Sequence, residues 1–236
     1  MATRKPSKFE LYNLKMTIKI MKKNLSAFVF PILFSLILMP TKAMSTDIGG
    51  VLWRGATWAT LGAIGYTNPF GADSFRMTFG GYPDHDALQL EANLRYNLGE
   101  TMPFISSSSI RPFLDVSYSS WQFLKDDGLS MTNKGNAFGI APGARFEWPT
   151  FAYITNFIDV RAGVSILAPD KLENKDGSVR NFGGNFTFSE QFAIGGFFST
   201  KKRWEWQLGV QHHSNHNIYE QNNGIEFYNL TFGYNY

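Results

Sequence analysis

Two side chains of catalytic type close a strand-like segment near the C-terminus, and a third opens the segment that follows. His212 and Ser214 end the run that starts at Trp204, and Glu226 begins the final run, 226–236. Alternate side chains of a strand point to the same face, so His212 and Ser214 share one. If the two segments pair as a hairpin, Glu226 joins them at one end of the same surface. A hydroxyl, an imidazole and a carboxylate are the nucleophile, base and orienting group of serine hydrolases.

The rows that carry these three residues are otherwise apolar. A lipid-facing or core row offers no partners to lone polar groups, and burying them unpaired costs free energy. His213 has the opposite parity and is expected on the other face, and His216 falls in the following loop. Polar residues at a strand end are also common in loops, and three histidines at this spacing match no standard metal geometry. The row of the first segment is Trp204, Trp206, Leu208 and Val210, opposite Glu205, Gln207, Gly209 and Gln211.

The N-terminus is typical of an export signal. A basic stretch from Met21 precedes 13 apolar residues, 27–39, and a small-residue cleavage site ends at Ala43. The apolar stretch is shorter than a spanning helix needs. Residues 1–20 fit either an extended leader or an upstream start. We therefore expect 1–43 to be removed, leaving 44–73 as a segment of undecided structure and 74–236 as the catalytic domain.

Charge and cysteine content exclude several classes of protein. The leader holds eight of the 22 basic residues and one of the 19 acidic ones, so 14 basic and 18 acidic residues remain, a net charge of −4. The basic isoelectric point therefore gives no support for nucleic-acid binding. The chain has no cysteine, which excludes disulfides and thiolate metal sites. No cofactor or metal is predicted.

Repeated alternation predicts an all-β fold. Segment 88–98 alternates without a break, and 158–166 places Asp159 and Arg161 opposite an apolar row. Polar sets on one face and apolar or aromatic sets on the other are typical of a transmembrane barrel with a polar lumen, whereas a soluble sandwich would fill its interior with the apolar face. Glu190 interrupts the apolar row of 186–198, which fits either a bulge or a position at the membrane interface.

The segments number eight, an even count as in bacterial outer-membrane barrels. The prediction is an eight-stranded antiparallel transmembrane β-barrel of the outer-membrane type. Residues 51–66 fit an additional strand, which would favour ten strands, an in-plane helix or a periplasmic segment. The predicted strands are 74–81, 87–98, 111–123, 136–148, 155–168, 185–199, 203–214 and 226–236.

Placing the C-terminus in the periplasm orients the barrel. Connections 82–86, 124–135, 169–184 and 215–225 then lie outside the cell and read as loops. His212, Ser214 and Glu226 would lie on the lipid-facing wall at the extracellular leaflet of the outer membrane, where the acyl chains of lipopolysaccharide are found.

Over roughly 74–236 the sequence resembles the lipid A 3-O-deacylase (PagL) family. The family pattern of His, any residue, Ser-Asn and a later Gly-any-Glu is met by His212, Ser214, Asn215, Gly224 and Glu226. The resemblance implies an eight-stranded barrel that removes the 3-O-linked 3-hydroxyacyl chain from lipid A. It also implies that Ser214 is the nucleophile, His212 the base and acid, Glu226 the orienting carboxylate and Asn215 an oxyanion donor.

Two other functions fit the same pattern of export and alternation. A non-catalytic barrel of the adhesin or channel type gives no reason for His212, Ser214 and Glu226 to interrupt lipid-facing rows. An acyltransferase acting on lipid A differs only in whether the acyl chain goes to water or to another lipid. Lipid A in the outer leaflet is the expected substrate, and pairing into a homodimer is left open.

Overall fold

The computed structural model describes residues 48–82, 87–104, 108–124, 131–151, 155–174, 176–198 and 200–236. The predicted export signal, 1–43, lies outside the described residues. The chain divides into two compact units, Met1–Gly71 and Ala72–Tyr236.

The described part of the first unit is one helix, α2, Ile48–Thr67. It ends where Asn68 takes a left-handed conformation, with φ 45°, and donates its backbone N–H to the carbonyl of Ile64. Asparagine tolerates this conformation and often ends helices. Of the alternatives for 51–66, the additional strand is therefore wrong. In the part of the chain that the structure describes, no helix is long and apolar enough to cross a membrane.

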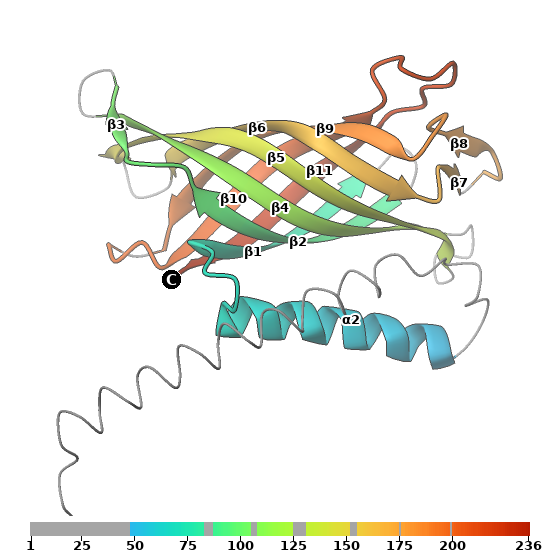
Figure 1. Ribbon diagram of the computed structural model, residues 1–236, viewed down its shortest axis with the longest axis horizontal. Coiled ribbons are helices and arrows are strands. Elements are labelled where there is room, and N and C mark those ends of the chain that lie inside the picture. Colours follow the sequence, from blue (N-terminus) through green and yellow to red (C-terminus); the bar gives the residue numbers. More distant parts are fainter. Residues whose placement is uncertain are drawn as a thin grey trace, which may run out of the picture. The chain divides into compact units, whose positions relative to one another are not determined.

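The second unit is a closed antiparallel barrel of eight strands, as the alternation predicts (Figure 1). Strands β1 and β11 pair with each other, as do β2 and β4, so the sheet closes. Ten strands and a soluble sandwich are both excluded. The barrel strands are β1 (Ser74–Tyr82), β2 (Ala87–Asn97), β4 (Ser109–Leu124), β5 (Met131–Phe151), β6 (Thr155–Ala168), β9 (Phe186–Phe197), β10 (Trp204–Ser214) and β11 (Ile225–Asn235).

Short strands extend both ends of the barrel. The two-residue β3, Met102–Pro103, pairs with the start of β4. Strands β7, Lys171–Glu173, and β8, Val179–Asn181, form a separate hairpin in a connection that the sequence predicts as a loop. This hairpin and the 215–224 loop extend beyond the same end of the barrel, opposite the C-terminus (Figure 1).

Alternation along β10 assigns its faces as predicted. Glu205, Gln207 and Gln211 are buried inside, whereas Leu208 and Val210 are exposed on the outer wall. The outward row of β10 therefore faces the surroundings of the barrel, as the apolar pattern requires of a membrane-spanning strand.

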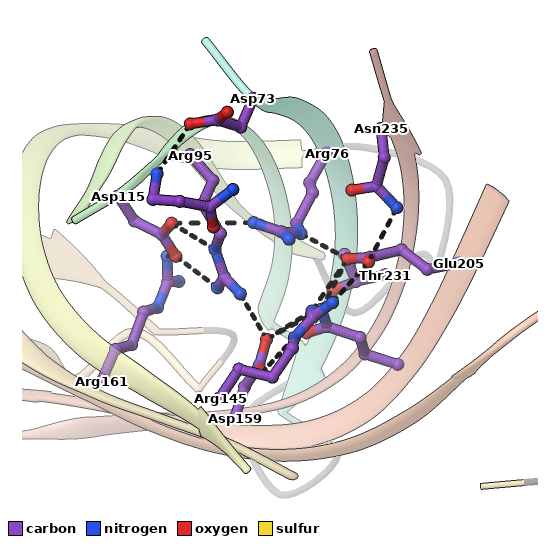
Figure 2. Close-up of polar contacts among 12 residues, drawn as sticks. Asp73, Arg76, Arg95, Asp115, Arg145, Asp159, Arg161, Glu205, Thr231 and Asn235 are labelled. Carbon is purple, nitrogen blue, oxygen red and sulfur yellow. Dashed lines mark hydrogen bonds and ion pairs between the residues drawn. The ribbon is translucent and has the colours of Figure 1, made fainter. Parts of the chain in front are cut away.

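The lumen is filled by side chains in two layers. Toward the end of the barrel that holds the C-terminus, arginines and carboxylates form ion pairs across the interior (Figure 2), among them Arg145 with Asp159 and Glu205. Buried charges are tolerated only when paired in this way. Toward the loop end an apolar cluster follows, made of Ala87, Trp121, Ala137, Leu167, Leu172, Phe182, Ile225 and Phe227. Leu172 and Phe182 come from the β7–β8 hairpin and its continuation, so the hairpin helps to close this end.

Candidate active site

Pairing of β9, β10 and β11 forms one cross-strand row on the outer wall, near the loop end. His212 lies directly opposite Glu226 of β11 and Glu190 of β9. Ser214, two residues farther along β10, lies opposite Phe188. The hairpin that the sequence predicts therefore forms, and it brings together two residues that lie 14 positions apart in the chain.

His212 and Glu226 form a half-exposed pair. The His212 Nδ1 and the Glu226 Oε1 atoms are 3.6 Å apart, and the two side chains are 39% and 49% exposed. Nδ1 itself is buried and has no hydrogen-bond partner among the described residues. A small approach of the carboxylate would therefore form the bond that fixes the tautomer and orientation of a catalytic imidazole.

Ser214 lies beside this pair without bonding to it. The residue is buried, with 5% of its surface exposed, and within the described ranges it makes no hydrogen bond to His212. The two are same-face neighbours about 7 Å apart along the strand, so rotamer changes must bring hydroxyl and imidazole together. Catalytic hydrogen bonds often tighten only when substrate is bound.

Asn215 supports the loop. Its side chain is fully buried, and its Nδ2 donates to the carbonyl of Phe182 at 2.6 Å and to that of Gln221. Its backbone N–H donates to Oδ1 of Asn222. The side-chain amide is thus occupied in joining the end of β10 to two loop segments. The oxyanion role implied by the family pattern stays a prediction, and this geometry favours a supporting role.

Gly224 gives the imidazole its space. A Cβ at this position would lie 3.0 Å from Cε1 of His212 and 3.1 Å from the carbonyl of His213, which is tighter than nine in ten real Cβ contacts. The backbone of Gly224 is in turn held by Arg180 of β8, whose Nη1 donates to the Gly224 carbonyl. Burial lowers the pKa of the Arg180 guanidinium. The sequence gives no signal for Arg180, because its partner lies 44 residues away in a different loop.

A second histidine–carboxylate pair lies next to the first. Nε2 of His216 is 2.5 Å from Oε1 of Glu190, and the His216 ring packs edge-on against Phe188, with centroids 4.8 Å apart. Both neighbours of β9 pair with it in unbroken register. Glu190 therefore interrupts its apolar row as a surface position and not through a bulge.

A family comparison decides what this barrel is related to. The model of the lipid A 3-O-deacylase (PagL) family matches residues 88–235, which include all three predicted catalytic residues. The chain belongs to the lipid A 3-O-deacylase family. The resemblance seen in the sequence is thereby confirmed, and the PagL-type barrel places the chain in the outer membrane.

A solved structure of the same family supports the fold. The crystal structure of the outer membrane enzyme PagL matches with a TM-score of 0.56 and 18% sequence identity, covering 69% of this chain and 99% of that one. The backbone structure of the Yersinia pestis outer membrane protein Ail, in a phospholipid bilayer nanodisc, covers 69% of this chain and 97% of that one. Its TM-score is 0.36 and its identity 9%. A search of curated proteins finds no match.

Proposed function

We propose that this chain is an esterase that hydrolyses the 3-O-linked acyl chain of lipid A with Ser214, His212 and Glu226. One observation carries the proposal. In a member of the PagL family, His212 and Glu226 face each other at 3.6 Å on the outer wall, with Ser214 the next residue but one on the same strand. A carboxylate, an imidazole and a hydroxyl in this order support acyl transfer without a metal.

The residues divide the reaction into two steps. Oγ of Ser214 attacks the ester carbonyl carbon while His212 takes the hydroxyl proton, and the charge on Glu226 stabilises the resulting imidazolium. His212 then returns the proton to the sugar oxygen as the ester bond breaks, leaving the acyl group on Ser214. A water molecule, deprotonated by His212, attacks the carbonyl carbon of this acyl-enzyme; His212 then gives that proton to Oγ of Ser214 as the acyl bond breaks, which releases a 3-hydroxy fatty acid and restores the serine.

The position of the site suits a lipid substrate. Leu208, Val210 and Tyr228 are exposed on the outer wall along the same two strands, where acyl chains of the bilayer would contact them. The site lies at the end of the barrel that carries the β7–β8 hairpin and the 215–224 loop. We infer that this end lies outside the cell, so that His212, Ser214 and Glu226 reach the leaflet that contains lipid A.

The interior of the barrel is filled by side chains, which disfavours a channel function. Ion pairs such as Arg161 with Glu91, at 2.7 Å, cross the lumen, and the apolar cluster around Trp121 and Phe227 fills its loop end. Both the ion pairs and the apolar cluster would block the passage of a solute through the lumen. Catalysis on the outer wall gives a reason for His212 and Glu226 to stand among exposed apolar residues.

Mass spectrometry of lipid A tests the proposal. Cells that express the protein should lose one 3-hydroxyacyl chain from lipid A, and cells that express Ser214→Ala should keep it. The free 3-hydroxy fatty acid should appear in equal amount. Unchanged deacylation by Ser214→Ala would refute the serine mechanism. Recovery of the acyl chain on another lipid would show an acyltransferase instead.

A further inference from the structure

His212 stands between two carboxylates. Its cross-strand partners are Glu226 on one side and Glu190 on the other, and directly opposed residues of a sheet have Cβ atoms about 4.5–5.5 Å apart. Both glutamates are therefore within reach of the same imidazole. A catalytic histidine needs one orienting carboxylate, and a second one on the opposite side could turn the ring the other way.

His216 keeps the second carboxylate occupied. Its Nε2 lies 2.5 Å from Oε1 of Glu190. The backbone around it is set for this contact, because His216 and Asn217 have φ values of 51° and 62°, and the N–H of Ile218 bonds to the carbonyl of Asn215. Two successive left-handed residues within such a bond make a type I′ turn. Few residues other than glycine adopt this conformation, and histidine and asparagine are among those that do so most often, so both residues suit the turn.

Packing fixes the imidazole of His216 as well. The ring lies edge-on against Phe188 with 4.8 Å between centroids, and Phe188 is the cross-strand neighbour of Ser214. The turn, the contact with Phe188 and the contact with Glu190 together hold His216 beside His212 and Ser214.

We propose that His216 is a positioning residue that holds Glu190 away from His212, so that Glu226 alone orients the catalytic imidazole. The inference rests on the proposed function, because it concerns the same histidine. Without His216, Glu190 would compete with Glu226 for Nδ1 and turn Nε2 away from Ser214. An unpaired negative charge beside His212 would also favour its protonated form, which cannot act as a base.

The charges that face His212 come from three elements. Glu226 faces it from β11, Glu190 from β9 and His216 from the loop after β10. The neighbouring His213 lies on the lumen face. Removal of His216 therefore leaves Glu190 without its imidazole partner, and both carboxylates then face His212. The acidic limb of the pH profile should move to higher pH.

The test compares three variants of the full-length protein in detergent micelles, with purified lipopolysaccharide as substrate. Asparagine tolerates the left-handed turn but has no atom at the position of Nε2, so His216→Asn removes the contact and keeps the loop. We expect His216→Asn to lower kcat about tenfold with little change in KM, and to move the acidic limb of kcat/KM to higher pH.

The second and third variants isolate the cause. Glu190→Gln removes the competing charge, and its kcat should stay within about twofold of the parent. The double variant His216→Asn/Glu190→Gln should recover the activity and pH profile of Glu190→Gln. Glu220→Gln, which changes an exposed carboxylate of the same loop, is the matched control and should equal the parent.

Each other result overturns the inference. A double variant as impaired as His216→Asn would mean that His216 acts directly, and a rise confined to KM would mean that it contacts substrate. An unchanged His216→Asn would remove any role for it. These outcomes differ from failure of the proposed function, in which the parent releases no fatty acid or Ser214→Ala retains activity. Circular dichroism and heat-modifiable gel mobility confirm folding of each variant.

Discussion

The inner and outer faces of the β10–β11 hairpin use the same residue types for opposite purposes. Inside, Glu205 is fully buried between Arg76 and Arg145, with contacts of 2.6 and 2.8 Å. Outside, Glu226 of the neighbouring strand is 49% exposed and faces His212 at 3.6 Å. The inner carboxylate is saturated with charged donors and can only stabilise the fold. The outer one is loosely engaged and remains available to respond to a change of charge on the imidazole.

Two adjacent histidines repeat this contrast. His213 is buried in the lumen, with its ring edge-on to Trp121 at 4.7 Å between centroids. His212 stands on the outer wall, beside Glu226 and Gly224. One step along a strand thus separates a packing residue from a catalytic candidate. If the comparison holds, changes on the outer face should affect activity, and changes on the inner face should affect stability.

The largest effect should follow removal of the proposed nucleophile or base. Ser214→Ala and His212→Ala should each lower deacylation of lipopolysaccharide about 10⁴-fold, because neither step of acyl transfer can proceed. Unfolding by urea should remain near that of the parent, since neither side chain is part of the apolar cluster in the lumen. EDTA should leave the parent enzyme active. Strong inhibition by the chelator would point to a metal-dependent hydrolase instead.

Glu205→Ala should have the next largest effect, and on stability. It leaves Arg76 and Arg145 with an uncompensated buried charge, which costs about 3–5 kcal/mol. Urea unfolding in micelles, followed by tryptophan fluorescence, measures this loss. Activity per folded molecule should stay close to the parent. A drop in that specific activity with no change in unfolding would break the division between the two faces.

Glu226→Ala should reduce activity by about 10–100-fold, less than loss of Ser214 or His212. In the proposed mechanism the carboxylate orients the imidazole and touches no reacting atom, so some correctly oriented His212 should persist without it. Steady-state assays should show the loss in kcat. Glu220→Gln serves as the control for a carboxylate in the adjacent loop. If Glu226→Ala matched the parent, the orienting role would have to be assigned to another group.

His213→Ala should have the smallest effect on activity, within about twofold. The side chain points into the lumen, away from Ser214, and its removal leaves a cavity beside Trp121 that costs about 1–3 kcal/mol of stability. The same unfolding and activity assays separate these outcomes. Loss of activity in a variant that unfolds like the parent would show that the two histidines have been assigned to the wrong faces.

The sequence predicts most of the barrel and the face of each candidate residue, because both follow from period-two alternation. The positions of Glu205 and His212 on opposite walls need nothing more than parity. Alternation says less about which strands are neighbours and in what register. The pairing of His212 with Glu190 depends on the β9–β10 register, and for that reason Glu190 could be recognised only as an interruption.

Loops account for the rest of what the sequence does not show. The β7–β8 hairpin has strands of three residues each, too short for a detectable period. The contacts of Asn215 with Phe182 and of Arg180 with Gly224 join segments far apart in the chain. The helix Ile48–Thr67 contains glycines, which weaken both helix and strand patterns. The sequence therefore could not distinguish a helix from a strand here.

The ion pairs of the lumen also act as cross-braces. Arg145 of β5 reaches Glu205 of β10, and Arg95 of β2 reaches Asp159 of β6, so the contacts join strands that are not neighbours in the wall. Sliding one of these strands by a residue would leave a buried charge without its partner, and flexing the barrel would stretch several contacts at once. The wall is thereby stiffened against the lateral pressure of the bilayer. Strand β10, which carries His212 and Ser214 near its other end, is tied from inside the barrel to β1 and β5 through Glu205.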